Sequence, residues 1–443
     1  VHTRRVETAA DCLREDGPAE RVVTLSVVFP IPTNHAVGME EVLLIDTLLV
    51  GVVVVLSIGM RYGAERVRVS PIVGYFVLGI LLRAASSLER VPLLTEQQVF
   101  PFLADLGVIV LLFRVGLESD LERLLDQLPE ASWIGLGNVL GSGGIAFLTA
   151  YNLIGWSLLP SLFVATALTA TSVGVTVAIW EEAGQVDTRE GATLLDVAEI
   201  DDLMGILLMA LLFSVAPILQ GAGPEGVLSA VGTTLVGTLL RFALLGAACL
   251  LFALYLERPM TTFFDRLHAG EGTMLVMLGV GFIVAAVAGM SGLSIAVGAF
   301  FAGLIFSRDP HTAQYMDAFR PLHDLLAPFF FVGIGLHLAP EMLVGVSGSV
   351  FLLLPAAVVG KVVGAYVPAR PLLGSSGALV LGLSLVPRAE IALVIMQRGL
   401  ERGDWAIPPG VFAQVVLISA VTVLAIPLVL RPQLTGMSPV SSQ

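Results

Sequence analysis

Long apolar runs separated by short polar intervals dominate this chain. The runs are about 17–25 residues long, the length that an α-helix needs to cross the hydrocarbon of a bilayer. A membrane β-barrel would instead show ten-residue segments of alternating polarity, and none are found along the sequence. The pattern therefore predicts an all-α polytopic membrane protein with about thirteen transmembrane helices.

The predicted spans leave no room between them for a soluble domain. They cover residues 40–60, 70–85, 98–117, 131–154, 158–181, 189–216, 226–256, 271–289, 291–307, 321–339, 348–369, 373–400 and 409–430. Residues 1–38 are polar and then broken by prolines, so we expect a poorly ordered tail there, or an upstream mis-start if translation begins at Met39. The membrane domain is then 39–430, and 431–443 is a cytoplasmic C-terminal tail.

Composition supports the membrane assignment and excludes some partners. The chain is 56% hydrophobic and only 13% charged, and its net charge of −13 argues against nucleic-acid binding. Cys12 and Cys249 lie far apart and indicate neither a disulfide framework nor a metal cluster.

Arginines in the loops orient the predicted bundle. The loops after odd-numbered spans and the C-terminal end hold eleven arginines, whereas the opposite loops hold four. Positively charged loops face the cytoplasm. We therefore expect the N-terminus outside and the C-terminus in the cytoplasm.

The two halves of the chain resemble one another. Residues 73–82 read VGYFVLGILL and 297–306 read VGAFFAGLIF, while 111–118 read LLFRVGLE and 330–337 read FFVGIGLH. The matched spans are seven apart, an odd number, so equivalent helices run in opposite directions. Inverted repeats with a site near the midplane are typical of secondary transporters, although shared apolar composition is an alternative explanation.

Matching spans of the two halves carry residues that interrupt a membrane helix. The run TATSVGVT holds Thr171 and Ser172, whose hydroxyls can satisfy freed backbone groups. The run VPRAEIAL holds Pro387, which removes a helical hydrogen bond, together with Arg388 and Glu390. We expect two crossed discontinuous helices whose opposing dipoles are offset by these two charges. The alternative is that small and hydroxyl residues only let helices pack closely.

Three charged residues lie near the middle of predicted spans, where a charge is expensive. Asp201 and Asp202 are adjacent near the centre of 189–216. Lys361, the only lysine among 23 basic residues, lies in 348–369. A buried ammonium must find an anion, and lysine, unlike arginine, can give up its proton. We interpret the three as an ion-handling group; a permanent structural ion pair is the alternative for Lys361.

Two further acids precede this pair on the same helix. Asp196, Glu199 and Asp202 follow one another at intervals of three residues, so they wind along one side of the helix from its Arg189 end. They form a candidate cytoplasmic funnel towards the centre. A first-turn acid favoured by the helix dipole is the alternative for Asp196.

The segments TATSVGVT, IDDLMG, GKVVG, PRAEIAL and GVIVLLFRVGLESDL are similar to those of the monovalent cation:proton antiporter superfamily, specifically NapA-type sodium/proton antiporters. The resemblance covers most of residues 40–430. It implies an NhaA/NapA-like fold with a mobile core, about 98–217 and 321–430, and with the remaining helices as a dimerisation or scaffold domain, hence a homodimer. It also implies that Asp202 binds the cation and that Asp201 pairs with Lys361. Asp196, Glu199 and Ala389 depart from the pattern of the family.

We therefore expect an electrogenic transporter that exchanges sodium or lithium for protons by alternating access in the inner (plasma) membrane, not an enzyme. Sodium would bind oxygens of Asp202, Asp201, Thr171 and Ser172, where protons compete for the same carboxylates. Its partners would be monovalent cations, protons and membrane lipid, with no cofactor and no nucleic acid. A potassium/proton antiporter is the nearest alternative. An ion channel and an intramembrane aspartyl protease are the alternatives from other classes. A channel would not need a buried site at which protons compete, and the protease is disfavoured because adjacent aspartates diverge by about 100° on a helix and cannot flank a peptide bond.

Overall fold

The computed structural model describes residues 39–66, 70–87, 99–119, 121–186, 188–221, 227–267, 271–308, 312–338 and 348–435. The chain divides into two compact units, 1–47 and 48–443. Of the first unit only the start of one helix is described, so the expected tail 1–38 lies outside the described residues, as does most of 431–443. Everything that follows concerns the second unit.

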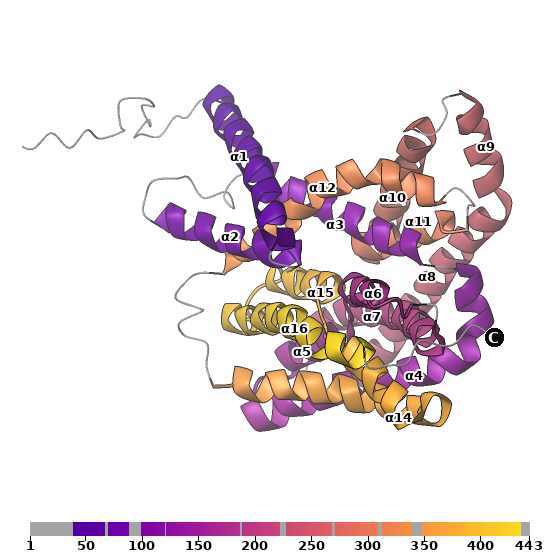
Figure 1. Ribbon diagram of the computed structural model, residues 1–443. Coiled ribbons are helices and arrows are strands. Elements are labelled where there is room, and N and C mark those ends of the chain that lie inside the picture. Colours follow the sequence, from indigo (N-terminus) through magenta and orange to yellow (C-terminus); the bar gives the residue numbers. More distant parts are fainter. Residues whose placement is uncertain are drawn as a thin grey trace, which may run out of the picture. The chain divides into compact units, whose positions relative to one another are not determined.

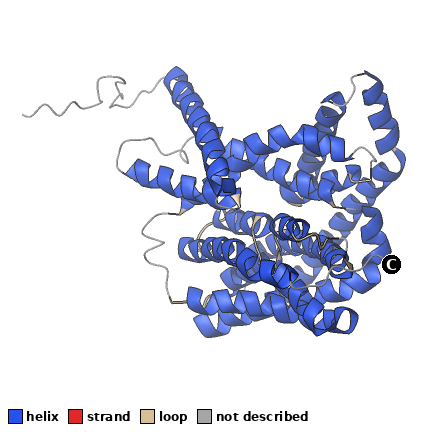
Figure 2. Cartoon of the chain, in the orientation of Figure 1, coloured by secondary structure: helices blue, strands red, loops and turns tan. Residues whose placement is uncertain are grey.

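All regular structure in the described residues is helical (Figures 1 and 2). The helices are α1 (Met39–Arg66), α2 (Pro71–Ser87), α3 (Val99–Glu118), α4 (Leu121–Leu148), the π-helix η2 (Thr149–Ile154), α5 (Leu158–Thr169), α6 (Val173–Glu182), α7 (Arg189–Gly221), α8 (Val227–Tyr255), α9 (Glu257–Leu267), α10 (Glu271–Met290), α11 (Ile295–Phe306), α12 (Thr312–His337), α14 (Val350–Ser384), α15 (Glu390–Leu400) and α16 (Pro409–Thr435).

Apolar length agrees with a multi-pass membrane protein. Within the described residues, nine helices are long and apolar enough to cross a membrane, and three shorter apolar helices accompany them. Helices are the expected solution because every backbone group in hydrocarbon needs an internal partner. The expected total of about thirteen spans stays a prediction.

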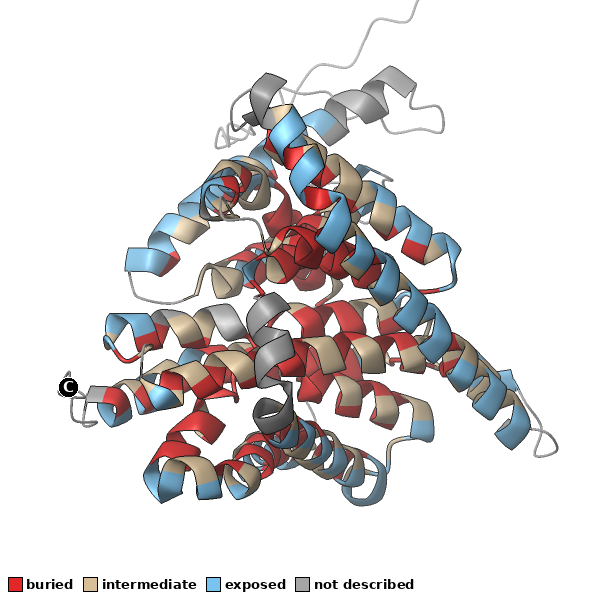
Figure 3. Cartoon of the chain, turned by 90° about the vertical axis from the view of Figure 1, so that its right-hand side faces the viewer, coloured by how far each residue is buried: buried red, intermediate tan, exposed pale blue. Residues whose placement is uncertain are grey.

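The helices of residues 48–443 pack in two bundles, which lie above and below one another in Figure 1. The first, here the continuous-helix bundle, contains α2, α3, α10, α11 and α12. The second, here the broken-helix bundle, contains α4, α5, α6, α7, α14, α15 and α16. Helix α8 packs on both α7 and α11 and so joins the two. Buried side chains concentrate where helices face one another within the bundles (Figure 3).

This packing differs from the grouping expected from the sequence, which put spans 98–117 and 321–339 in the mobile core. Their helices, α3 and α12, pack chiefly on each other and on α2 and α11. Glycines allow the close approach: a Cβ on Gly107 would lie 2.5 Å from the Leu326 carbonyl oxygen. A side chain at that position would force α3 and α12 apart, so this contact requires a glycine.

Two other features depart from the expected spans. Helix α14 contains most of the span 348–369 and the first part of the span 373–400. It continues through a kink at Gly374 (φ 69°), a conformation that glycine adopts without strain. The interval 257–270, expected as a loop, contains the amphipathic helix α9. There Glu257 and Thr261 are buried one turn apart, while Phe263 is 58% exposed.

Candidate functional site

The first helix break separates α5 from α6. Helix α5 ends at Thr169, and the backbone of Ala170 and Ser172 is extended before α6 begins at Val173. The break therefore exposes the last carbonyls of α5 and the first amides of α6 to the interior of the bundle. These are groups that an uninterrupted helix would have paired.

The second break separates α14 from α15, and it lies against the first. Helix α14 ends at Ser384 and α15 begins at Glu390. The Ser172 amide donates to the Pro387 carbonyl at 2.7 Å, and the Thr176 hydroxyl donates to the Ser384 carbonyl at 2.7 Å. Each broken segment thus supplies partners to the other, because Pro387 cannot donate but its carbonyl can accept.

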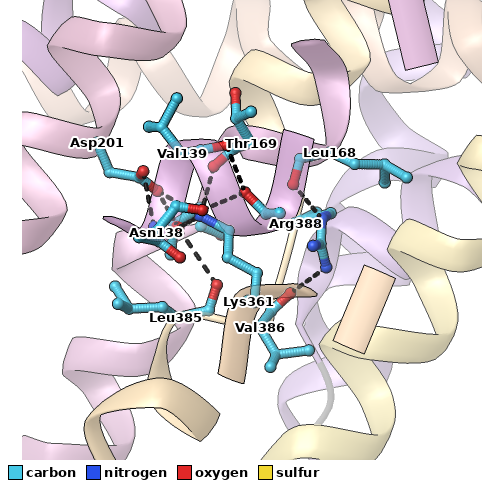
Figure 4. Close-up of polar contacts among 12 residues, drawn as sticks. Asn138, Val139, Leu168, Thr169, Asp201, Lys361, Leu385, Val386 and Arg388 are labelled. Carbon is cyan, nitrogen blue, oxygen red and sulfur yellow. Dashed lines mark hydrogen bonds and ion pairs between the residues drawn. The ribbon is translucent and has the colours of Figure 1, made fainter. Parts of the chain in front are cut away.

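Arg388 is the positive charge at the break. Its side chain is fully buried and donates to three carbonyls: Leu168 (Nε, 3.1 Å), Val386 (Nη1, 2.8 Å) and Ala357 (Nη2, 2.8 Å) (Figure 4). Leu168 lies in the last turn of α5, where the helix dipole is negative. A guanidinium placed there satisfies freed carbonyls and offsets that dipole.

Glu390 is the negative charge at the break. It lies in the first turn of α15 and accepts from the Ser172 hydroxyl at 3.1 Å, next to the start of α6. Helix N-termini carry partial positive charge, so a carboxylate is stabilised there. Arg388 therefore lies at the carbonyl end of one half-helix, and Glu390 lies at the amide ends of two.

Asp201 is enclosed by donors from three other helices or breaks (Figure 4). Its Oδ2 accepts from Lys361 Nζ of α14 at 2.6 Å and from the Thr171 hydroxyl of the first break. Its Oδ1 accepts from Asn138 Nδ2 of α4 at 2.8 Å. Lys361 Nζ also donates to the Thr169 carbonyl and, at 2.8 Å, to the Thr171 hydroxyl. Asp201 and Lys361 are both 0% exposed, so the pair is fully desolvated.

Glycines bring Lys361 to this position. A Cβ on Gly141 of α4 would lie 2.6 Å from the Gly364 Cα of α14, and a Cβ on Gly360 would lie 3.0 Å from the Ser142 Cα. The two backbones therefore touch on either side of Lys361 along α14. Small residues at such contacts are the usual means by which membrane helices approach closely.

Asp202 has different surroundings from its neighbour. It is buried, 5% exposed, but its Oδ1 has no hydrogen-bond partner among the described residues. It lines a cavity of about 950 Å³ between the two bundles, and Asp201 does not. Consecutive residues on a helix point about 100° apart, which explains how one carboxylate is enclosed and the other is reached from a cavity.

The cavity extends from Asp202 to the C-terminal ends of α1 and α16. Among its lining residues are Thr171, Glu199 and Glu390 beside Asp202, and Arg431 near the helix ends. Of the two expected funnel residues, Glu199 lines the cavity, whereas Asp196 does not occur among its described lining residues. Ser172 is likewise not among the described residues that line the cavity, and its hydroxyl donates to Glu390.

An ion pair joins the two bundles at the other end of α15. Arg398 donates to Asp105 of α3 at 2.6 Å and to Glu401 at 2.9 Å. Glu390 at the start of α15 lines the cavity, whereas Arg398 lies in the last turn of the same helix. The cavity and this ion pair therefore lie at opposite ends of α15.

Sequence reasoning missed Asn138. It is 0% exposed and contacts the enclosed aspartate directly. The available signal was the one side-chain amide in the glycine-rich run GLGNVLGSGG, which lies inside the predicted span 131–154. Buried amides need partners, so such a residue indicates a polar neighbour even when its identity is unknown.

The arrangement suits a small hard cation or a proton. It offers carboxylate, hydroxyl and carbonyl oxygens at the inner end of a cavity, the ligands that hard cations prefer. The described residues hold no group of three or more His, Cys, Asp or Glu side chains fit for a bound metal cofactor.

Comparisons with known proteins agree with this chemistry. A family described as "Sodium/hydrogen exchanger, transmembrane" matches residues 44–436. The high-affinity Na(+)/H(+) antiporter NhaS3 of Synechocystis sp. is 27% identical over 355 residues, covering 77% of this chain and 73% of the relative. A Na(+)/H(+) antiporter of Enterococcus hirae is 25% identical over 401 residues, covering 89% and 98%. The solved sodium proton antiporter MjNhaP1 of Methanocaldococcus jannaschii shares the fold, with a TM-score of 0.65 at 16% identity over 89% of this chain and 99% of that one.

Proposed function

This chain belongs to the sodium/hydrogen exchanger family of monovalent cation:proton antiporters, and we propose that it exchanges sodium for protons across the membrane. The observation that carries the proposal is the difference in surroundings between the adjacent aspartates. Asp201 is held by Lys361, whereas Asp202 has an unpaired oxygen and lines the cavity. One carboxylate is thus available to an ion while its neighbour is not.

Competition at Asp202 is the proposed basis of exchange. A proton and a sodium ion neutralise the same carboxylate, so binding of one excludes the other. We assign Asp202 and Thr171 as sodium ligands, with Asp201 joining when Lys361 releases it. Ser172 is a less direct ligand because its hydroxyl donates to Glu390. Glu199 lies on the cavity wall and attracts cations on their way in.

Alternating access requires the site to face each side in turn. We propose that the broken-helix bundle moves against the continuous-helix bundle, with α8 as the connection. Support comes from the position of the cavity between the bundles at one end and of the Arg398–Asp105 ion pair at the other. The mobile unit that we propose is the broken-helix bundle. It differs from the mobile core expected from the sequence because it leaves out α3 and α12, which pack in the continuous-helix bundle.

Net charge movement depends on Lys361. When sodium reaches Asp201 it competes with the ammonium, and the freed lysine can lose its proton because it stays buried without the carboxylate that it paired with. One proton then leaves Asp202 and one leaves Lys361 for each sodium that binds. The exchange is electrogenic on this account.

We further propose a homodimer in the inner (plasma) membrane, with the N-terminus outside and the C-terminus in the cytoplasm. The excess of arginines in the loops on one side supports the orientation. The similarity to NapA-type proteins supports the dimer.

Transport in proteoliposomes tests the function. A pH gradient is imposed and dissipated by sodium, lithium or potassium, for the native protein and for Asp202→Asn. Asparagine keeps the shape of the side chain but cannot carry the contested charge, so we expect saturable sodium-dependent proton flux only in the native protein. Substantial flux in Asp202→Asn contradicts the site, and a response to potassium alone contradicts the cation. Flux that does not saturate indicates a channel.

A further inference from the structure

We propose that Asn138 is a positioning residue of the cation site, which holds the Asp201 carboxylate in place through its amide while Lys361 binds and leaves. This inference rests on the proposed function. It assigns a role to a side chain that lies neither in the cavity lining nor in the motifs that identify the family.

The contacts of Asp201 show why its carboxylate needs a donor other than Lys361 and Thr171. Lys361 and Thr171 both act on Oδ2, so Oδ1 depends on Asn138 Nδ2, at 2.8 Å (Figure 4). When sodium displaces Lys361, the amide remains the donor on the opposite side of the carboxylate. A hydrogen bond to an ionised group is about twice as strong as one between neutral groups.

The amide itself is held on one side only. Asn138 Oδ1 is buried and has no hydrogen-bond partner among the described residues. The orientation with Nδ2 towards Asp201 follows from charge, because two oxygens facing each other would repel. Since no second bond locks the amide, it can follow the Asp201 carboxylate as Lys361 leaves and sodium arrives. Neither leucine nor a carboxylate at this position could donate to Asp201.

The backbone beneath Asn138 is fixed. A Cβ on Gly364 would lie 3.1 Å from the Asn138 Cα, so α4 and α14 touch at this residue. The Ser142 hydroxyl donates to the Asn138 backbone carbonyl at 2.6 Å. Only the amide group can move while the backbone stays in register with Lys361, which is what a positioning residue needs.

The expected consequence is a loss of apparent sodium affinity and not of turnover. Asn138 contacts neither the cavity nor the continuous-helix bundle in the described structure, so the bundle movement does not depend on it. Without the donor, the Asp201 carboxylate is less well placed when sodium arrives. Loss of one hydrogen bond to a charged group corresponds to roughly a tenfold rise in the half-saturating sodium concentration.

The experiment compares Asn138→Leu and Asn138→Ala with Ser161→Ala. Leucine keeps the volume of the side chain and alanine removes it, and both lack the N–H donor. Ser161→Ala removes a buried hydroxyl of α5 that donates to the Ser157 carbonyl at 2.8 Å and has no bond to Asn138 or Asp201 among the described residues. In proteoliposomes we expect both Asn138 variants to need about ten times more sodium for half-maximal exchange, with maximal rates within about threefold of native. Ser161→Ala should leave both parameters unchanged.

A second measurement keeps the inference testable if a variant transports poorly. Sodium that binds the folded protein raises its melting temperature in detergent, and the concentration needed for half of that rise gives the affinity without transport. Unchanged sodium affinities in both Asn138 variants overturn the inference, as does an equal change in Ser161→Ala. If the native protein does not exchange sodium, the proposed function is wrong. If the native protein exchanges sodium and the Asn138 variants have the same sodium affinity, only the inference about Asn138 is wrong.

Discussion

Replacing Lys361 with glutamine separates the contribution of the buried ion pair to stability from its proposed contribution to charge movement. The substitution removes the ammonium that binds Asp201 at 2.6 Å but leaves the carboxylates, Thr171 and the cavity untouched. Glutamine is of similar length and neutral, so the site keeps its ligands and loses one exchangeable proton. Sodium/proton exchange should continue, but as one proton for one sodium.

The structure sets the size of the effect on stability. Breaking a buried ion pair by removing one partner costs about 3–5 kcal/mol, since the other charge stays desolvated. Asp201 keeps the donors Asn138 and Thr171 in this variant. We therefore expect a loss near the lower end, about 3 kcal/mol, seen as a drop of roughly 5 °C in melting temperature.

The electrical effect is larger and more diagnostic. One elementary charge moved through 100 mV is worth about 2.3 kcal/mol, so the sodium gradient reached at equilibrium changes about 50-fold for each 100 mV in an electrogenic exchanger. In Lys361→Gln it should not change. The assay sets the membrane potential of proteoliposomes with a potassium ionophore and records sodium content together with a voltage-sensitive dye.

Lys361→Arg is the matched control. A guanidinium keeps the positive charge beside Asp201 but does not release its proton. This variant should resemble glutamine in its lack of voltage response and should retain more of the native melting temperature. Full voltage-dependent transport by Lys361→Gln would refute the reasoning and reduce Lys361 to a structural residue.

Two further predictions follow from the cavity and from the helix contacts. Glu199→Gln should raise the half-saturating sodium concentration measured from the cavity side more than it lowers the maximal rate, because Glu199 lines the cavity. Asp196→Asn is the control and should change neither parameter, because Asp196 is not among the described lining residues. Equal effects in both variants would argue against a funnel through Glu199. Gly141→Val should destabilise the fold by about 1–3 kcal/mol in a detergent melting assay, because its Cβ would lie 2.6 Å from the Gly364 Cα. Gly144→Val is its control, since nothing lies within 4 Å of a Cβ at Gly144, and a melting temperature as low as that of Gly141→Val would exclude the packing explanation.

The sequence predicted the charged centre because burying charge in a membrane is expensive. Asp201, Asp202 and Lys361 stood out in apolar spans, and the structure brings Asp201 and Lys361 into one ion pair. The breaks were visible for a similar reason, since a hydroxyl run and Pro387 are unusual at membrane depth. Local chemistry was sufficient for these features.

Features that depend on contacts between distant helices were not predictable. Nothing in the composition of α3 or α12 tells which bundle each joins, because both are apolar and a glycine in the sequence does not show which helix approaches it. The partner of Asn138 is 63 residues away in the sequence, so Asn138 was missed because its own span does not show which residue its amide would meet. Asp196 shares the spacing of Glu199, yet the bundle around the helix decides which of them meets the cavity.

The three bonds of Arg388 have a consequence for how affinity is distributed between the two faces of the membrane. One side chain fastens a carbonyl of α5, one of the α14–α15 link and one inside α14. In the alternating access proposed above, these segments move as one unit and Arg388 keeps its three carbonyl partners. The oxygens around the ion then keep their relative positions on both faces of the membrane. A difference in apparent sodium affinity between the two faces is therefore expected to come from access to the site and not from its ligands.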